Sequence, residues 1–290
     1  MNEKLNQIRQ EKKKAQILVL FCTAGLLVSL VLTIRRSPLA IGFYAAVLVF
    51  YLVVFRRQSK RFQQTVKTAT LTECLRPYLK NITYQEKNGL ETGHIAQARL
   101  LPVEHPKSIL IRDTVRGTYQ ALPVFLSDVT VDYQTIRPTK SGDEKSMIDF
   151  LSGNWFEIQL KEALPFSCTI WDKKLVPAPV REQFFSDYRC SDICQPPAFR
   201  EQFSTYTRNH SDCSIPEELE KALLKLAEAT PGQIAVQLDG KVFRIFIRNR
   251  FLYTHELSPK IEATAQLLTH NQYPEISYIL RAADAVRGMV

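Results

Sequence analysis

Residues 17–34, ILVLFCTAGLLVSLVLTI, and residues 39–55, LAIGFYAAVLVFYLVVF, are two apolar runs that contain no charged side chain. Only Arg35-Arg36-Ser37-Pro38 separates them. An α-helix rises about 1.5 Å per residue, so each run reaches roughly 26 Å and nearly crosses a bilayer core of roughly 30 Å. The runs therefore predict a transmembrane helical hairpin at 17–55 that turns at 35–38 and follows a basic tail at 1–16.

Two other interpretations of these runs fit less well. A cleaved signal peptide has one short apolar stretch before a small-residue cleavage site, whereas here a basic turn leads into a second stretch. Core helices of a soluble domain would each carry a polar face. The polar residues of the runs are too scattered to form such a face: Thr23, Ser29, Thr33 and Tyr44.

Basic side chains flank the runs on both outer sides. The flanks include Lys12, Lys13, Lys14, Arg56, Arg57, Lys60 and Arg61, whereas the turn has only Arg35 and Arg36. Because the more basic flanks of membrane spans stay in the cytoplasm, we expect a multi-pass protein of the cell membrane with both termini cytoplasmic.

The formal net charge of +9 lies entirely in the first 61 residues, which hold 11 basic and 2 acidic side chains. The rest of the chain is neutral overall. A basic footprint beside a bilayer favours anionic lipid headgroups as the partner of the flanking residues and argues against nucleic acid.

The remaining chain predicts a juxtamembrane linker helix at 56–80 and a cytoplasmic α+β domain at 81–290, with a division near 185–213 left open. Runs of β-branched and aromatic residues between Gly, Pro and Asp predict a mostly antiparallel sheet. The expected strands cover 108–112, 118–126, 129–134, 155–160 and 167–171. Turns are expected at Asn88-Gly89 and at Gly93, and an exposed loop tip at 139–145.

The last ninety residues predict a helix-hairpin-helix region. Ser214 and Glu217 have capping-box spacing at the start of an amphipathic helix that ends near Thr230-Pro231-Gly232. Asp239-Gly240 predicts a tight turn between strands 233–238 and 241–248, and 251–255 suggests a third strand. Two closing helices are expected after Ser258-Pro259 and Tyr273-Pro274.

Three stretches also resemble those of a known family. They are 150–156 with the strand at 165–171, then 199–206, and then the helix at 214–226 with the hairpin at 233–247. The order of these stretches is similar to that of uncharacterised bacterial membrane proteins with a domain of unknown function. That resemblance implies an N-terminal helix pair and a cytoplasmic α+β region, and it implies no catalytic residue. After Tyr206 the chain departs from the family's pattern.

Four residues form a candidate metal site: Cys190, Cys194, His210 and Cys213. Zinc prefers four sulfur or imidazole ligands in a tetrahedron, and this set has the right number and types. The spacing is not that of paired Cys-x2-Cys knuckles, and Pro196-Pro197 interrupts any helix continuing from Cys194. The alternative is that they are ordinary thiols and a surface histidine, as a reducing cytoplasm allows.

Arg244 and Arg248 are candidate anion-binding residues on the second hairpin strand. Guanidinium groups match the oxygens of phosphate or a lipid headgroup. The alternative is one solvated strand face over a packed one. Phosphate-binding glycine loops are absent from the sequence, which disfavours nucleotide hydrolysis.

With no catalytic motif, the sequence favours a membrane-anchored interaction module, a scaffold or sensor for a protein partner. The alternative is a membrane-bound metal-dependent enzyme or hydrolase that uses the Cys190, Cys194, His210 and Cys213 region. A deep polar pocket with converging ionisable groups would favour the enzyme, and an exposed apolar patch would favour the module.

Overall fold

The computed structural model of the 290-residue chain describes residues 2–34, 39–87, 89–103, 108–138, 144–190, 195–207, 215–230, 232–252, 273 and 275–289. Contacts between residues divide the chain into two compact units. The described residues of the first unit are those up to Cys74. Those of the second run from Leu75 to Leu252 and continue at the C-terminal end.

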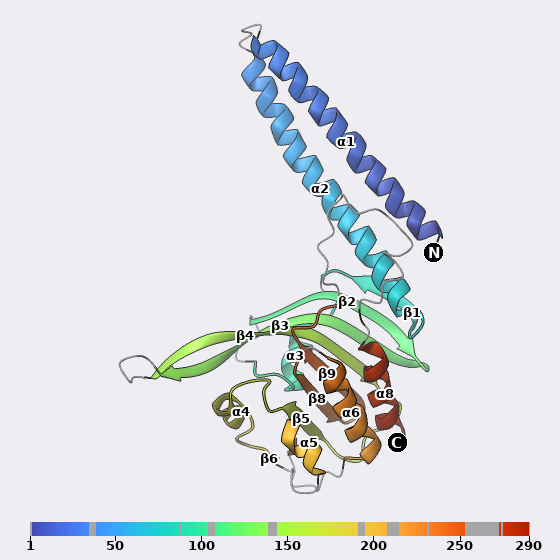
Figure 1. Ribbon diagram of the computed structural model, residues 1–290, viewed down its shortest axis with the longest axis vertical. Helices are drawn as coiled ribbons and strands as arrows, with labels where there is room; N and C mark the ends of the chain where they lie inside the picture. Colours follow the sequence, from blue (N-terminus) through green and yellow to red (C-terminus); the bar gives the residue numbers. More distant parts are fainter. Residues whose placement is uncertain are drawn as a thin grey trace. The chain divides into compact units, whose positions relative to one another are not determined.

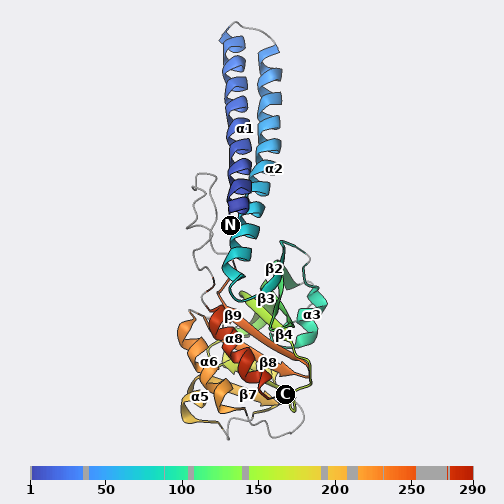
Figure 2. The ribbon, with the colours of Figure 1, turned by 90° about the vertical axis from the view of Figure 1, so that its right-hand side faces the viewer.

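The described part of the first unit consists of two long helices, α1, Asn2–Ile34, and α2, Leu39–Leu75, whose last residue belongs to the second unit. They lie side by side and antiparallel (Figures 1 and 2). The residues of α1 that are buried at seven-residue intervals are Ile8, Ala15, Cys22 and Ser29. This is the spacing of a coiled-coil seam. A Cβ added to Gly25 would lie 3.2 Å from Val47 Cγ1, so the two helices approach closely there.

The structure revises two expected boundaries in this unit. The tail at 1–16 is helical from Asn2 and continues without a break into the apolar run. The linker helix expected at 56–80 is the second half of α2. This helix ends at Leu75, because Pro77 disfavours helical geometry at the residue before it and has no N–H for a helical hydrogen bond.

One segment of the described helices, Leu5–Val31 of α1, is long and apolar enough to cross a membrane. A membrane anchor and a signal sequence near an N-terminus share these properties. Large apolar side chains of both helices are exposed, among them Leu20 and Phe21 at 72% and 70% and Val49 and Val53 on α2. An apolar N-terminal helix is thus confirmed, and a second span stays a prediction.

The described part of the second unit contains a nine-stranded sheet in which every pairing is antiparallel, as the sequence predicts. The strand order is β1-β2-β3-β4-β9-β8-β5-β7-β6. The strands are β1 Lys80–Gln85, β2 Ile109–Tyr119, β3 Leu122–Pro138, β4 Glu144–Gln159, β5 Cys168–Asp172, β6 Arg189–Cys190, β7 Phe203–Thr207, β8 Ile234–Asp239 and β9 Val242–Arg248. The described strands of the stretch near 185–213, β6 and β7, belong to this same sheet.

Two local predictions in the first half of the sheet are wrong. Residues 118–126 do not form one strand, because the chain turns at Gln120 and Ala121, which have φ of 48° and 67°. Neither residue type is typical of a left-handed turn, so the sequence pattern does not mark it. Gly93 lies not in a turn but in helix α3, Thr92–Ala98.

The hairpin at the C-terminal end is confirmed. β8 and β9 pair from Ile234 with Ile247 to Asp239 with Val242, and Gly240 has φ of +56° in the turn between them. Helix α6, Glu217–Ala229, begins after Pro216 without a side-chain cap, so Pro216 precedes the first turn rather than lying in it. Helix α8, Ile276–Arg287, is the last predicted helix. Residues 251–252 are not in a strand, and 253–272 lie outside the described residues.

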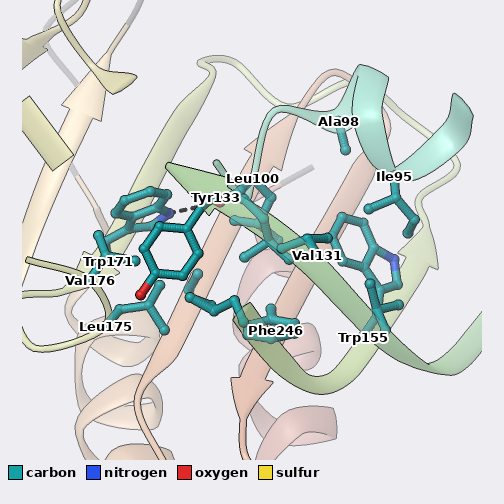
Figure 3. Close-up of a cluster of buried hydrophobic side chains, with 14 of the residues drawn as sticks. Ile95, Ala98, Leu100, Val131, Tyr133, Trp155, Trp171, Leu175, Val176 and Phe246 are labelled. Carbon is teal, nitrogen blue, oxygen red and sulfur yellow. Dashed lines mark hydrogen bonds between the residues drawn. The ribbon is translucent and has the colours of Figure 1, made fainter. Parts of the chain in front are cut away.

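Helices cover both faces of the central strands. On one face, α3 and α4, Ala178–Phe184, pack with β-strand side chains into a cluster around Trp155, Trp171 and Phe246 (Figure 3). Trp171 Nε1 donates a hydrogen bond to Leu100 O at 2.9 Å. On the other face, α6 and α8 pack against each other beside β9 (Figures 1 and 2). The short helix α5, Pro197–Gln202, leads into β7. The centre of the sheet is therefore fully buried.

Candidate functional site

A row of polar side chains crosses the buried centre of the sheet. Glu157 of β4 lies opposite Arg244 of β9, which lies opposite Gln237 of β8. Cross-strand partners share a face, so these side chains meet. Arg244 Nε donates to Glu157 Oε2 at 2.8 Å, and its Nη1 donates to Gln237 Oε1 at 2.9 Å. The Glu157 side chain is 1% exposed.

Helix α3 brings a fourth residue to this row. His94 Nε2 lies 2.7 Å from the same Glu157 Oε2 that accepts from Arg244. Burial by itself would raise the pKa of Glu157, but the His94 hydrogen bond and the Arg244 charge outweigh it, so the pKa lies below its ordinary value. Glu157 is therefore an ionised, buried carboxylate at neutral pH. Within the described residues its Oε1 has no hydrogen-bond partner.

Gln237 links this row to the end of α3. Its Nε2 donates to the carbonyl oxygen of Ala98, the last residue of the helix. The next residue, Arg99, caps the helix in the left-handed conformation with φ of 51°. The buried row therefore holds the C-terminal end of α3 at a defined place on the sheet.

A polar cavity of about 240 Å³ opens beside Gln237. Its walls come from the end of α3, the first residues of β5, the end of β8, β7 and the loop before β6. The side chains that line it are mostly amides, hydroxyls and phenols, with one guanidinium from Arg99 and one carboxylate from Asp239. Such a wall is suited to hydrogen-bonding a small polar molecule.

Apolar side chains are exposed at another place, on a ribbon formed by β3 and β4. β2 pairs with β3 only as far as Val131, and β9 pairs with β4 only from Gly153, so residues 132–138 and 144–150 pair only with each other in the described structure. The ribbon projects beyond the other strands (Figure 1). Ile136, Ile148 and Phe150 share one face of it and are 54%, 63% and 64% exposed.

A second buried polar cluster lies on the face of the sheet opposite the Glu157 row. Asp128 Oδ1 accepts hydrogen bonds from Leu252 N at 2.8 Å and from Asn154 Nδ2 at 3.3 Å. Tyr273 donates to Asn154, and burial raises the pKa of Tyr273 well above its ordinary value. These groups hydrogen-bond to one another, so this cluster stabilises the fold.

The structure buries one predicted anion-binding residue, Arg244, and half-buries the other, Arg248. Arg244 is 8% exposed and bonded as above, and Arg248 Nη1 donates to Leu175 O at 2.9 Å. Both faces of β9 are packed, so the alternative that Arg244 lies on a solvated strand face is wrong. Whether either residue binds an anion stays a prediction.

The predicted metal ligands are described only in part. Cys190 lies on the edge strand β6 and is exposed, whereas Cys194, His210 and Cys213 lie outside the described residues. Within the part of the chain that is described, no three His, Cys, Asp or Glu side chains form a metal-binding group. The zinc site stays a prediction.

The residues expected to meet lipid headgroups lie on the two long helices. Lys12, Lys13 and Lys14 belong to α1, and Arg56, Arg57, Lys60 and Arg61 belong to α2. The antiparallel pairing brings the two groups to the same end of the hairpin, as Gln58 Nε2 donates to Glu11 Oε2 at 2.7 Å between them. The sequence flanks thus form one basic cluster.

Sequence reasoning missed Glu157 and Gln237 and did not place His94 beside them. The row of Glu157, Arg244 and Gln237 depends on the register of β4, β9 and β8, which joins residues far apart in the chain. A glutamate inside the apolar strand 155–160 was an available signal, because a charge at a core-facing strand position needs a buried partner.

Comparison of the chain with protein-family models, with curated proteins and with solved structures found no match. The resemblance to the bacterial membrane-protein family stays an expectation. The fold defines an α+β protein with an apolar N-terminal helix.

Proposed function

We propose that this protein is a membrane-anchored interaction module whose α+β unit binds a protein partner on the cytoplasmic side. Helices α1 and α2 both cross the membrane, and the basic cluster at their shared end faces anionic headgroups. The support is the number of exposed apolar side chains on both helices and the basic residues that flank the two runs.

The exposed apolar face of the β3–β4 ribbon carries the binding proposal. Monomeric soluble domains rarely hold a row of exposed large apolar side chains without a partner, since each exposed side chain forgoes burial worth about 1.5–3 kcal/mol. Ile136, Ile148 and Phe150 lie beyond the packed sheet, so they contribute little to its core. Binding a partner would remove them from water.

Site-specific photo-crosslinking in cells tests the partner proposal. A photoreactive amino acid at 148 or 150 should give the same discrete adduct, identified by mass spectrometry. The matched control is position 147 on the opposite face of the ribbon, where Met147 is 41% exposed. Equal labelling at 147, or no adduct at 148 and 150, would contradict the proposal.

Sidedness has a separate test. Ser37→Cys places a thiol in the turn between the apolar runs, and the native exposed Cys190 serves as an internal control. A membrane-impermeant maleimide applied to intact cells should label the variant at residue 37 and leave Cys190 unlabelled until the cells are opened. The intact mass of the membrane-extracted protein distinguishes an anchor from a cleaved signal sequence.

A further inference from the structure

The polar cavity beside Gln237 holds one positive and one negative side chain. Arg99 and Asp239 both line it, and neither carries an ion pair in the described structure. Because the two side chains do not bond to each other, the guanidinium donors of Arg99 and the carboxylate of Asp239 are both available to a ligand. A ligand with both signs of charge would engage the two together.

The position of Arg99 is built into the fold. The residue adopts φ of 51°, a conformation that costs free energy for any residue with a side chain. Its backbone N–H donates to Ala96 O at 3.4 Å, and the preceding carbonyl of Ala98 accepts from Gln237. The buried Glu157–Arg244–Gln237 row thus maintains a backbone geometry that sets Arg99 on the cavity wall.

Asp239 lines the same cavity from the end of β8, next to the β8–β9 turn. Ser167 Oγ donates to its Oδ1 at 3.1 Å, and its second carboxylate oxygen has no bond within the described residues. The remaining wall includes the side chains of Gln97, Tyr188 and Tyr206. Tyr206 stacks on Phe185 with ring centroids 3.9 Å apart, which fixes its ring. The wall is therefore polar and nearly free of aliphatic groups.

We infer that this cavity binds a small zwitterion of the α-amino acid class. Arg99 donates two hydrogen bonds to the ligand carboxylate, Asp239 accepts from its ammonium group, and the amide and phenol groups hydrogen-bond the rest of the ligand. A cavity of about 240 Å³ has room for one such molecule. The inference does not depend on the ribbon or on the proposed protein partner.

Calorimetric titration of the full-length protein in detergent micelles tests it, with the standard proteinogenic amino acids as probes. At least one should bind saturably. For that probe, the amide analogue without the carboxylate and the N-acetyl analogue without the ammonium should each bind about tenfold more weakly or worse.

Two variants assign the charges. Arg99→Gln should weaken binding of the amino acid about tenfold and abolish the preference over its amide. Asp239→Asn keeps a turn-compatible residue and should abolish the preference over the N-acetyl form. Arg112→Gln and Glu182→Gln, both exposed and outside the cavity, are matched controls that should bind as the natural protein does.

The melting temperature of each unliganded variant shows whether it is folded. Binding of no amino acid, binding of neutral polyols instead, or equal losses in the control variants would overturn the inference. If Arg99→Gln does not fold, the analogue series on the natural protein still decides the outcome, because it needs no substitution.

Discussion

At the scale of single residues, the centre of the sheet contains a buried ion pair, Glu157 and Arg244. The Glu157 carboxylate and the Arg244 guanidinium are both buried, compensate each other's charge, and form further hydrogen bonds with His94 and Gln237. Replacing both members of such a pair by apolar residues often leaves stability unchanged, whereas removing one member leaves the other as an unpaired buried charge and lowers stability.

Arg244→Gln or Glu157→Gln alone should therefore lower the free energy of unfolding by about 3–5 kcal/mol. The double variant should lose clearly less than the sum of the two single losses, because no unpaired charge remains. Chemical denaturation of the full-length protein in micelles measures this. Arg112→Gln, on an exposed position of β2, is the control and should change stability little. Additive losses would contradict the coupling.

The same carboxylate predicts a pH dependence. The pKa of Glu157 in the fold lies below its ordinary value near 4.5. A group with a lowered pKa stabilises the fold above the unfolded-state value, and this contribution is lost as the pH falls through the folded-state value. Stability should thus fall as the pH drops below about 4.5, and more steeply than in Glu157→Gln. Melting temperatures between pH 7 and 3 check the difference in slope.

At the scale of elements, two glycines differ in the space available for a side chain. A Cβ on Gly153 in β4 would lie 2.0 Å from Ile247 O of the neighbouring strand, whereas a Cβ on Gly93 in α3 would meet nothing within 4 Å. Gly153→Ala should cost about 1–3 kcal/mol by forcing β4 and β9 apart. Gly93→Ala should be neutral or stabilising by about 0.5–1 kcal/mol. Similar effects at both positions would exclude this close strand contact.

The two tight hairpin turns differ in whether the residue with a left-handed φ is a glycine. Ala121 holds a left-handed φ of 67° between β2 and β3, and Gly240 holds +56° between β8 and β9. Ala121→Gly should stabilise the protein by about 0.5–1 kcal/mol, and Gly240→Ala should destabilise it by a similar amount. Thermal unfolding of the two variants should shift in opposite directions, and shifts of the same sign would refute the turn geometry.

These turns also explain what the sequence can predict of the fold. The Asp239-Gly240 hairpin, helix α8 and the antiparallel class follow from local residue preferences. The turn at Gln120 and Ala121 does not, because tertiary pairing imposes it on residues without left-handed preference. The partners of Glu157 depend on the register between β4, β9 and β8, and the cavity depends on the packing of α3 beside β5, β7 and β8. A local pattern can therefore mark the buried glutamate, but not its partners or the cavity. Among the candidate site residues that the structure describes, Arg244 alone belongs to this row, where it bonds to Glu157 and Gln237.

At the scale of the whole molecule, charge is unevenly distributed along the chain. All of the net charge of +9 lies in the first 61 residues, on α1 and α2 and the stretch between them. Basic side chains close to a membrane surface each gain roughly 1 kcal/mol from anionic lipid. Changing Lys12, Lys13 and Lys14 to Gln should therefore reduce the anionic lipid that co-purifies in native nanodiscs. Lipid mass spectrometry measures this, with Lys221→Gln of α6 as the control, which should leave the lipid composition unchanged.

The strand order has a consequence for biosynthesis. β4 ends at Gln159, but its second neighbour β9 begins only at Val242. While the ribosome is still producing the intervening residues, β1 to β4 can already pair. The other edge of β4 then has unpaired backbone N–H and C=O groups, which can pair with another chain. That edge of β4 can therefore close only after Val242–Arg248, in the last sixth of the chain, has been synthesised, and a truncation upstream of β9 would leave the edge open to aggregation.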